Sequence, residues 1–167
     1  LNHVDRTVLD EAEKNYLDIL GKWNLYNNPQ EKGPTIFINW WDSLQQIIFT
    51  DELNQSTMPV IKPEKFVLLE ALLRDTCFRF VDNIKTQEKE TLSQAVTSAF
   101  KKAGDALRTA EKEGRLNWAS YKNTTIYHLL RTGALPFARA GLNNGGGVNI
   151  INATQHDHGP SWRMVVH

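Results

Sequence analysis

Residues 34–48 read PTIFINWWDSLQQII and predict a long amphipathic helix. Their apolar side chains recur at spacings of three, four and one, which places them on one face of a helix with 3.6 residues per turn. These side chains are Ile36, Phe37, Trp40, Trp41, Leu44, Ile47 and Ile48. Pro34 suits the first helical turn. Because Trp40 and Trp41 lie on the apolar stripe, we interpret them as packing residues rather than as a stacking platform for a ligand.

The same periodicity predicts further helices on both sides of this segment. The first spans residues 4–25, and another opens after Pro63. That helix carries four apolar side chains on one face: Phe66, Leu69, Leu72 and Leu73. A long helix is predicted to start with Thr86 as its N-cap and to end near Gly114, followed by a short helix around residues 124–131.

After Pro136 the sequence becomes strand-like. The run Asn143-Asn144-Gly145-Gly146-Gly147 is typical of a turn that needs a positive φ, and residues 148–152 and 161–166 on its C-terminal side have the composition of strands. We therefore expect a mainly α chain with a small C-terminal β-hairpin (α+β). The predicted domains are a helical domain over residues 1–135 and a β-hairpin over residues 136–167.

Composition excludes two classes of partner. Nineteen basic residues balance nineteen acidic ones, so the formal net charge of zero gives no electrostatic footprint for nucleic acid or an anionic lipid surface. No apolar run approaches the length of a membrane span. Cys77 is the single cysteine, which excludes an internal disulfide and a cysteine-based metal site. Because its neighbour Phe78 is apolar, we predict that Cys77 is a buried structural thiol.

Several short motifs suggest chemistry, and each has a simpler explanation. The run of Gly145 to Gly147 lacks both the Lys-Ser/Thr of a Walker loop and the strand and helix of a dinucleotide site, so we reject a phosphate cradle. His156 and His158 could bind a metal, but their position beside Gly159-Pro160 favours a polar turn.

Three further residues are candidates for a functional site. His128 lies on the predicted short helix, where a packing histidine is the default and a general base the minority interpretation. Ser161 lacks the second glycine of a hydrolase elbow. Arg163 lies within the second predicted strand, where its charge should be paired. The residues alone therefore predict no convincing active site.

Both ends of the sequence are expected to lie inside a longer protein. Leu1 stands on the approach to an amphipathic segment, and His167 follows the apolar run Met164-Val165-Val166. The backbone groups of an unfinished strand need hydrogen-bond partners.

Two blocks near the C-terminus carry a resemblance to a known family. Residues 144–153 read NGGGVNIINA, and residues 158–166 read HGPSWRMVV. Together they strongly resemble the penicillin acylase (penicillin amidase) family, which has such a Gly-rich turn, an Asn-Ala pair and a Gly-Pro-Ser-Trp/Tyr-Arg-Met-Val-Val block late in its large subunit. Looser, collinear matches extend the resemblance over nearly the whole chain and include Leu17 to Trp23, Trp118 and His128.

The resemblance implies an N-terminal-nucleophile amidohydrolase, a class that is periplasmic or otherwise exported and in which a precursor cleaves itself into two subunits. The new N-terminal Ser of the large subunit attacks the amide carbonyl. The substrates of this class of enzyme are amides of hydrophobic acyl groups, such as penicillin-like or acyl-homoserine-lactone-like compounds. Leu1 is not a nucleophile, and the matching segment lies downstream of that Ser. We therefore expect the chain alone to be inactive and to hold no cofactor, with calcium a candidate for the parent enzyme.

His167 is the one site residue that the resemblance suggests. In some cephalosporin-acylase-like relatives, an acidic residue just after the Val-Val pair orients a catalytic histidine. His167 stands at that position here. The implied role of His167 is to orient a catalytic residue without contacting the substrate itself.

The leading hypothesis is a structural segment whose partners are the rest of the parent enzyme, namely the nucleophile-bearing part of the large subunit and the small subunit. It predicts exposed apolar surface on the isolated chain. The alternative is a free-standing helical module that docks a partner through the aromatic helix around Trp40-Trp41. A third hypothesis is a compact enzyme that uses His128, His156 or His158.

Overall fold

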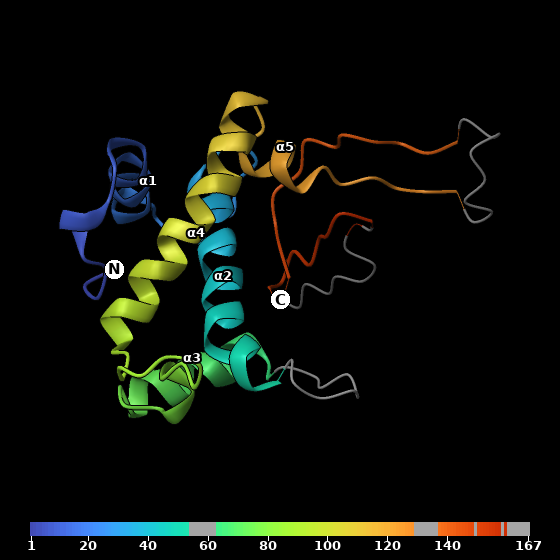
Figure 1. Ribbon diagram of the computed structural model, residues 1–167. Helices are drawn as coiled ribbons and strands as arrows, with labels where there is room; N and C mark the ends of the chain where they lie inside the picture. Colours follow the sequence, from blue (N-terminus) through green and yellow to red (C-terminus); the bar gives the residue numbers. More distant parts are fainter. Residues whose placement is uncertain (54–62, 129–136, 149, 158, 160–167) are drawn as a thin grey trace. The chain divides into compact units, whose positions relative to one another are not determined.

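The computed structural model describes residues 1–53, 63–128, 137–148, 150–157 and 159. Within them the chain forms five α-helices: α1 (Glu11–Lys22), α2 (Gly33–Leu53), α3 (Lys65–Arg74), α4 (Leu92–Lys112) and α5 (Trp118–Lys122) (Figure 1). Two short 3-10 helices are also present, η1 (Arg6–Val8) and η2 (Arg79–Val81). The described part of the chain contains no strand, so the prediction of a mainly helical protein is confirmed.

The chain forms two compact units, each built from separate stretches of sequence. Unit 1 comprises Leu1–Gly21 and Phe37–Arg108, and unit 2 comprises Lys22–Ile36 and Thr109–His167. The long helices α2 and α4 therefore contribute to both. The predicted domain boundary at residue 135 concerns a sheet of the parent enzyme, so it stays a prediction.

Unit 1 has its core where α2 packs against α4. Trp40 is buried, and its indole Nε1 donates a hydrogen bond of 3.1 Å to the carbonyl of Val96. The rings of Trp40 and Phe100 meet edge to face at 5.3 Å, a favoured geometry for aromatic pairs. Trp41 is half-buried and stacks on Phe37 at 5.9 Å. The interpretation of the two tryptophans as packing residues is confirmed for Trp40 and holds in part for Trp41.

The first helix is shorter than the predicted span of residues 4–25. α1 begins at Glu11 because Asp10 and Glu13 cap each other. The Glu13 amide donates to Asp10 Oδ1 at 2.9 Å, and the Asp10 amide donates to Glu13 Oε2 at 3.0 Å. This reciprocal capping box satisfies two amides that the first turn leaves open. Before it, the amide of Thr7 donates to the Asp5 carboxylate at the start of η1.

The predicted N-cap of α4 was wrong. The helix starts at Leu92 because Thr91 and Gln94 form the capping pair. The Thr91 amide donates to Gln94 Oε1 at 2.7 Å, and the Gln94 amide donates to Thr91 Oγ1 at 3.3 Å. The hydroxyl of Thr86 instead donates to Glu90 Oε1 at 2.6 Å and closes the preceding loop. The predicted end is confirmed, since Gly114 follows Lys112 closely and has a φ of 67°.

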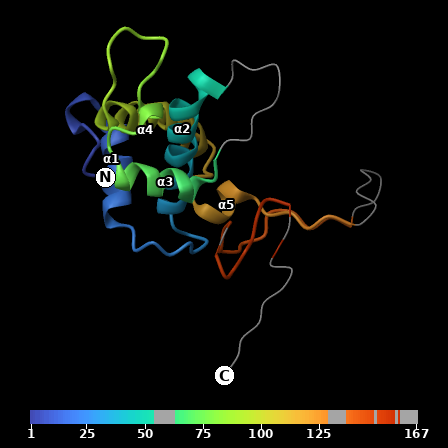
Figure 2. The same cartoon turned by 90° about the horizontal axis from the view of Figure 1, so that it is seen from below.

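The apolar face predicted for α3 was also wrong. Leu68 and Leu72 point into unit 1, whereas Phe66, Leu69 and Leu73 are 67%, 44% and 75% exposed. The start of α3 lies beside α2, where Lys65 pairs with Asp42 (Figure 2). With the helix held in this rotation, only one of the four predicted residues, Leu72, faces inward.

The short helix near the C-terminal region lies earlier than predicted. α5 spans Trp118–Lys122 and ends at Asn123, whose φ of 47° turns the chain out of the helix. Residues 124–128 of the predicted helix over 124–131 are extended, and 129–131 lie outside the described residues. Ile126 forms an antiparallel bridge with Arg139 through two backbone hydrogen bonds of 2.9 and 2.8 Å.

The predicted β-hairpin is not seen in the described residues. Val148, Ile150, Ile151 and Asn152, which belong to the first predicted strand, lie in a turn and bends. Residues 161–166, the second predicted strand, lie outside the described residues. The hairpin as a whole therefore stays a prediction, and the predicted fold class is confirmed only in its mainly α part.

Candidate functional site

The structure describes some of the predicted site residues and not others. His158, Ser161, Arg163 and His167 lie outside the described residues, so the predicted role of His167 stays untested. His128 lies outside any helix, contrary to the predicted helix, with its ring 5.3 Å from that of Phe137.

The interpretation of His156 as part of a polar turn agrees with its surroundings. The residue lies in a bend, and its Nδ1 is 3.0 Å from the carbonyl of Asn123 and 3.2 Å from that of Lys122. This ring nitrogen therefore contacts the C-terminal end of α5. The part of the chain that the structure describes contains no group of three or more His, Cys, Asp or Glu side chains placed to hold a metal ion.

The glycine-rich segment, residues 143–147, follows an irregular path in unit 2. Gly146 has a φ of 87°, so the predicted positive φ is confirmed at this residue. The Gly146 amide donates to the carbonyl of Asn27 at 3.0 Å, and the Gly147 amide donates to that of Asn152 at 3.1 Å. The glycines thus allow close backbone approach, and their carbonyls face the end of α5.

Lys122 is the centre of this arrangement. Its side chain is 8% exposed, and its ammonium donates to the carbonyl of Gly145 at 2.7 Å and to the hydroxyl oxygen of Thr154 at 2.5 Å. The carbonyl of Gly146 lies 3.5 Å away. All three oxygen atoms carry no formal charge. We call these four residues, Lys122, Gly145, Gly146 and Thr154, the lysine nest.

Trp118, one turn earlier on α5, closes the same nest. Its indole Nε1 donates to the carbonyl of Gly146 at 2.6 Å, and the Lys122 ammonium lies 5.6 Å from the Trp118 ring centroid. That distance is within cation–π range. Backbone hydrogen bonds also hold the start of α5, since the amides of Trp118 and Ala119 donate to the carbonyls of Glu31 and Pro29.

The lysine nest contains the residue types of a hydrolytic dyad, but its threonine hydroxyl is buried. A lysine beside a threonine hydroxyl can act as base and nucleophile in acyl transfer. Burial lowers the pKa of Lys122 to about 8, in the direction that such a base requires. However, Thr154 is 1% exposed and its hydroxyl donates to the Gly145 carbonyl at 2.7 Å. The hydroxyl is thus buried and engaged with the backbone, so the geometry of the lysine nest is that of a group that holds the backbone.

The lowered pKa of Lys122 predicts a pH dependence of stability. Between pH 8 and its ordinary pKa of 10.5, the lysine keeps its proton in the unfolded chain and loses it in the folded one. The unfolded state then binds more protons, so stability rises with pH across this window. We expect the free energy of unfolding of the wild type, relative to Lys122→Met, to increase from pH 8 to pH 10.5 in urea titrations. A constant difference over that range would contradict the prediction.

Sequence reasoning missed Lys122 and Thr154. A lysine at the end of a five-residue helix reads as an ordinary surface residue, and Thr154 is 32 residues away. The available signal was the Gly-rich run itself, because consecutive glycines mark places where another group approaches the backbone closely.

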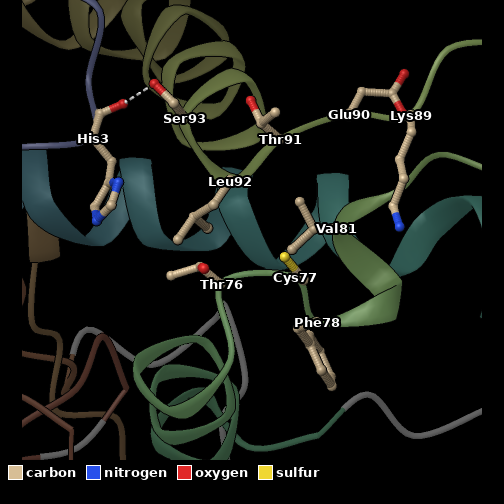
Figure 3. Close-up of a pocket in the computed structure, with 10 residues that line it drawn as sticks. All are labelled: His3, Thr76, Cys77, Phe78, Val81, Lys89, Glu90, Thr91, Leu92 and Ser93. Atoms are coloured by element: carbon tan, nitrogen blue, oxygen red, sulfur yellow. Dashed lines mark hydrogen bonds between the residues drawn. The ribbon is translucent and has the colours of Figure 1, made fainter.

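Unit 1 contains a separate hollow with a volume of about 540 Å³ (Figure 3). Ten residues line it: His3, Thr76, Cys77, Phe78, Val81, Lys89, Glu90, Thr91, Leu92 and Ser93. Cys77 is exposed there, so the prediction of a buried thiol was wrong. Two residues further along, the chain enters η2, and the Cys77 amide is held by the Asp75 carboxylate in a surface turn.

Two of the polar side chains around the hollow, Ser93 and Glu90, already form hydrogen bonds. Ser93 Oγ donates to the carbonyl of His3 at 2.8 Å. The Glu90 carboxylate accepts from the Thr86 hydroxyl and the Asn83 amide, which lowers its pKa. Figure 3 shows His3 and Cys77 apart, with Thr76 and Leu92 between them, so they do not form a nucleophile–base pair. The hollow can therefore accept an apolar group but presents no convergent catalytic groups.

The comparisons with known proteins give one match. A family model described as penicillin amidase matches residues 1–167. No curated protein and no solved structure gives a match. Among the described residues, no helix is both long and apolar enough to cross a membrane.

Proposed function

The chain belongs to the penicillin amidase family, and we propose on this premise that it is a structural segment of an amidohydrolase acting on amides of hydrophobic acyl groups. The observation that carries the proposal is the match of the family model, which spans residues 1–167. Penicillin-like and acyl-homoserine-lactone-like compounds are the proposed substrates, because the sequence resembles acylases of this kind.

The proposed parent enzyme uses a nucleophile that lies outside this chain. We propose the N-terminal Ser of a processed large subunit, with its own α-amine as base, in an exported and periplasmic enzyme. The inaccessible hydroxyl of Thr154 and the separation of His3 from Cys77 support a structural role for the chain. Calcium, where the parent binds it, is proposed to lie in other parts of that enzyme.

Exposed apolar side chains support the proposal that other parts of the parent enzyme cover this chain. On α3, Phe66 and Leu73 are 67% and 75% exposed, and in unit 2 Ile151 is 84% exposed. Phe66, Leu69 and Leu73 recur at spacings of three and four, so they form one exposed apolar stripe on α3. Contiguous apolar surface of this kind marks interaction sites, whereas single exposed apolar residues do not. On the helix around Trp40-Trp41, through which the alternative module would dock a partner, Trp40 is buried, Trp41 is half-buried and Phe37 is 40% exposed.

The test compares the isolated chain with the native parent. With a chromogenic anilide of an aromatic acyl group as substrate, we expect no hydrolysis above the buffer rate by the isolated chain, and turnover by the parent. Mass and N-terminal sequencing of the native product should give a large subunit that begins with Ser and contains residues 1–167. A native species starting near Leu1 and ending near His167 would contradict the proposal and favour the interaction module.

The role proposed for His167 needs the full-length enzyme. If His167 supports the catalytic residues, His167→Ala in the parent should lower kcat with little change in KM, because substrate binding is not its task. Unchanged turnover in that variant would rule the role out.

A further inference from the structure

We propose that Lys122 positions the glycine-rich segment. The hydrogen bonds that its ammonium donates, rather than the packing of the aliphatic part of its side chain (its stem), fix the path of residues 145–147. The inference goes beyond the proposed function and does not depend on it. It concerns how the block that carries the family resemblance, from residue 144 onward, is held against α5.

The ammonium of Lys122 lies beside backbone carbonyls of the glycine-rich segment that have no hydrogen-bond donor from regular secondary structure. Residues 143–147 belong to no helix or strand, so their carbonyls lack the partners that regular structure provides. The ammonium supplies a donor to Gly145 at 2.7 Å and has Gly146 at 3.5 Å, while Trp118 supplies a second donor to Gly146. Three donors on one buried cation match the three oxygen atoms of the lysine nest.

Lys122 also links this segment to a later part of the chain. Its ammonium binds the hydroxyl oxygen of Thr154, and that hydroxyl donates to the Gly145 carbonyl at 2.7 Å. Next to this, Thr124 Oγ1 donates to the carbonyl of Gln155 at 2.8 Å. The lysine head therefore joins α5 to residues 145–146 and to residue 154 at a single point.

The stem of Lys122 cannot by itself explain these contacts. An apolar side chain of the same length could fill the space beside Trp118, but it would remove one of the two donors to the part-buried Gly145 carbonyl and leave it the Thr154 hydroxyl. It would also remove the donor to Thr154 Oγ1, in a residue that is 1% exposed, and a buried acceptor that loses its donor is costly. The titratable group that faces this site is His156, whose ring contacts the carbonyls of Lys122 and Asn123 and not the ammonium.

Hydrogen exchange on the full 167-residue chain tests the inference. Lys122→Met keeps the stem and removes the donors. We expect the amides of Gly146 and Gly147 to exchange about ten-fold faster or more in this variant, as the loss of a charge-assisted hydrogen bond would cause. Lys122→Arg keeps a donor-rich cation and should restore much of the protection. Lys112→Met is the matched control, because Lys112 is likewise the last residue of its helix but is exposed.

Several outcomes decide the matter. Equal exchange in wild type and Lys122→Met would overturn the proposal, since the stem alone would then suffice. Equal acceleration by Lys112→Met would overturn it as well. If Lys122→Met loses protection throughout the helices, Thr154→Val decides instead. Faster exchange confined to residues 143–147 in that variant supports the lysine nest, and unchanged exchange there overturns it.

Discussion

Phe100→Ala is expected to lower the free energy of unfolding by about 3–5 kcal/mol, the usual cost of emptying a phenylalanine site in a packed core. Phe100 is 1% exposed and meets the ring of Trp40 edge to face. Removing the ring leaves a cavity between α2 and α4 and takes away the aromatic partner of Trp40. Urea or thermal unfolding followed by circular dichroism measures the effect directly.

The matched control is Phe66→Ala, the same truncation on the exposed side of α3. Phe66 is 67% exposed, so the change should stay within about 0.5 kcal/mol of the wild type. Similar losses in the two variants would contradict the assignment of Phe100 to the core and of Phe66 to the surface.

Gly146→Ala is the second substitution with a large expected effect. Gly146 has a φ of 87°, and a Cβ built on it would lie 2.1 Å from the carbonyl oxygen of Asn152. A left-handed conformation costs an alanine about 1–2 kcal/mol, and relieving the overlap costs about 1–3 kcal/mol more. The backbone must move, which breaks the hydrogen bond from the Gly147 amide to Asn152 and the one from Trp118 to Gly146. We therefore expect a clear shift of the urea midpoint.

Gly21→Ala provides the contrast. Gly21 lies in α1, and no heavy atom of a neighbouring group lies within 4 Å of an added Cβ. Alanine is the better helix former by about 1 kcal/mol. This variant should therefore be slightly more stable than the wild type. If Gly146→Ala were as stable as Gly21→Ala, the close approach of residues 146 and 152 would be wrong.

The candidate site could be predicted from the sequence only in part. The need for a positive φ at Gly146 follows from the glycine run, because only glycine adopts that conformation freely. The residue that donates hydrogen bonds to the glycine carbonyls could not be predicted from the sequence. Lys122 lies more than twenty residues earlier, and a charge buried among carbonyls contradicts the ordinary expectation that lysine is exposed. The hydrogen bonds between Lys122, Gly145 and Thr154 exist only once distant segments meet.

The helix boundaries likewise depend in part on the sequence and in part on contacts made only in the folded chain. Both Thr86 and Thr91 satisfy the sequence rule for an N-cap. Thr91 caps α4 because its amide donates to the side-chain oxygen of Gln94, whereas the Thr86 hydroxyl donates to Glu90. For α3, periodicity selected the face of Phe66, Leu69, Leu72 and Leu73, but apolar residues occur on more than one side of this helix, and packing in unit 1 buries Leu68 and Leu72.

Sequence information was sufficient to establish that this chain is mainly helical, that α2 and α4 are its long packed helices, and that it belongs to the penicillin amidase family. These properties depend on periodicity and on short motifs, which are local. The tertiary structure alone decided which face of α3 is buried, where α5 lies and that Lys122 holds the glycine-rich segment. Those depend on which distant carbonyls and side chains come within hydrogen-bond or packing distance, and that is settled only when the chain is folded.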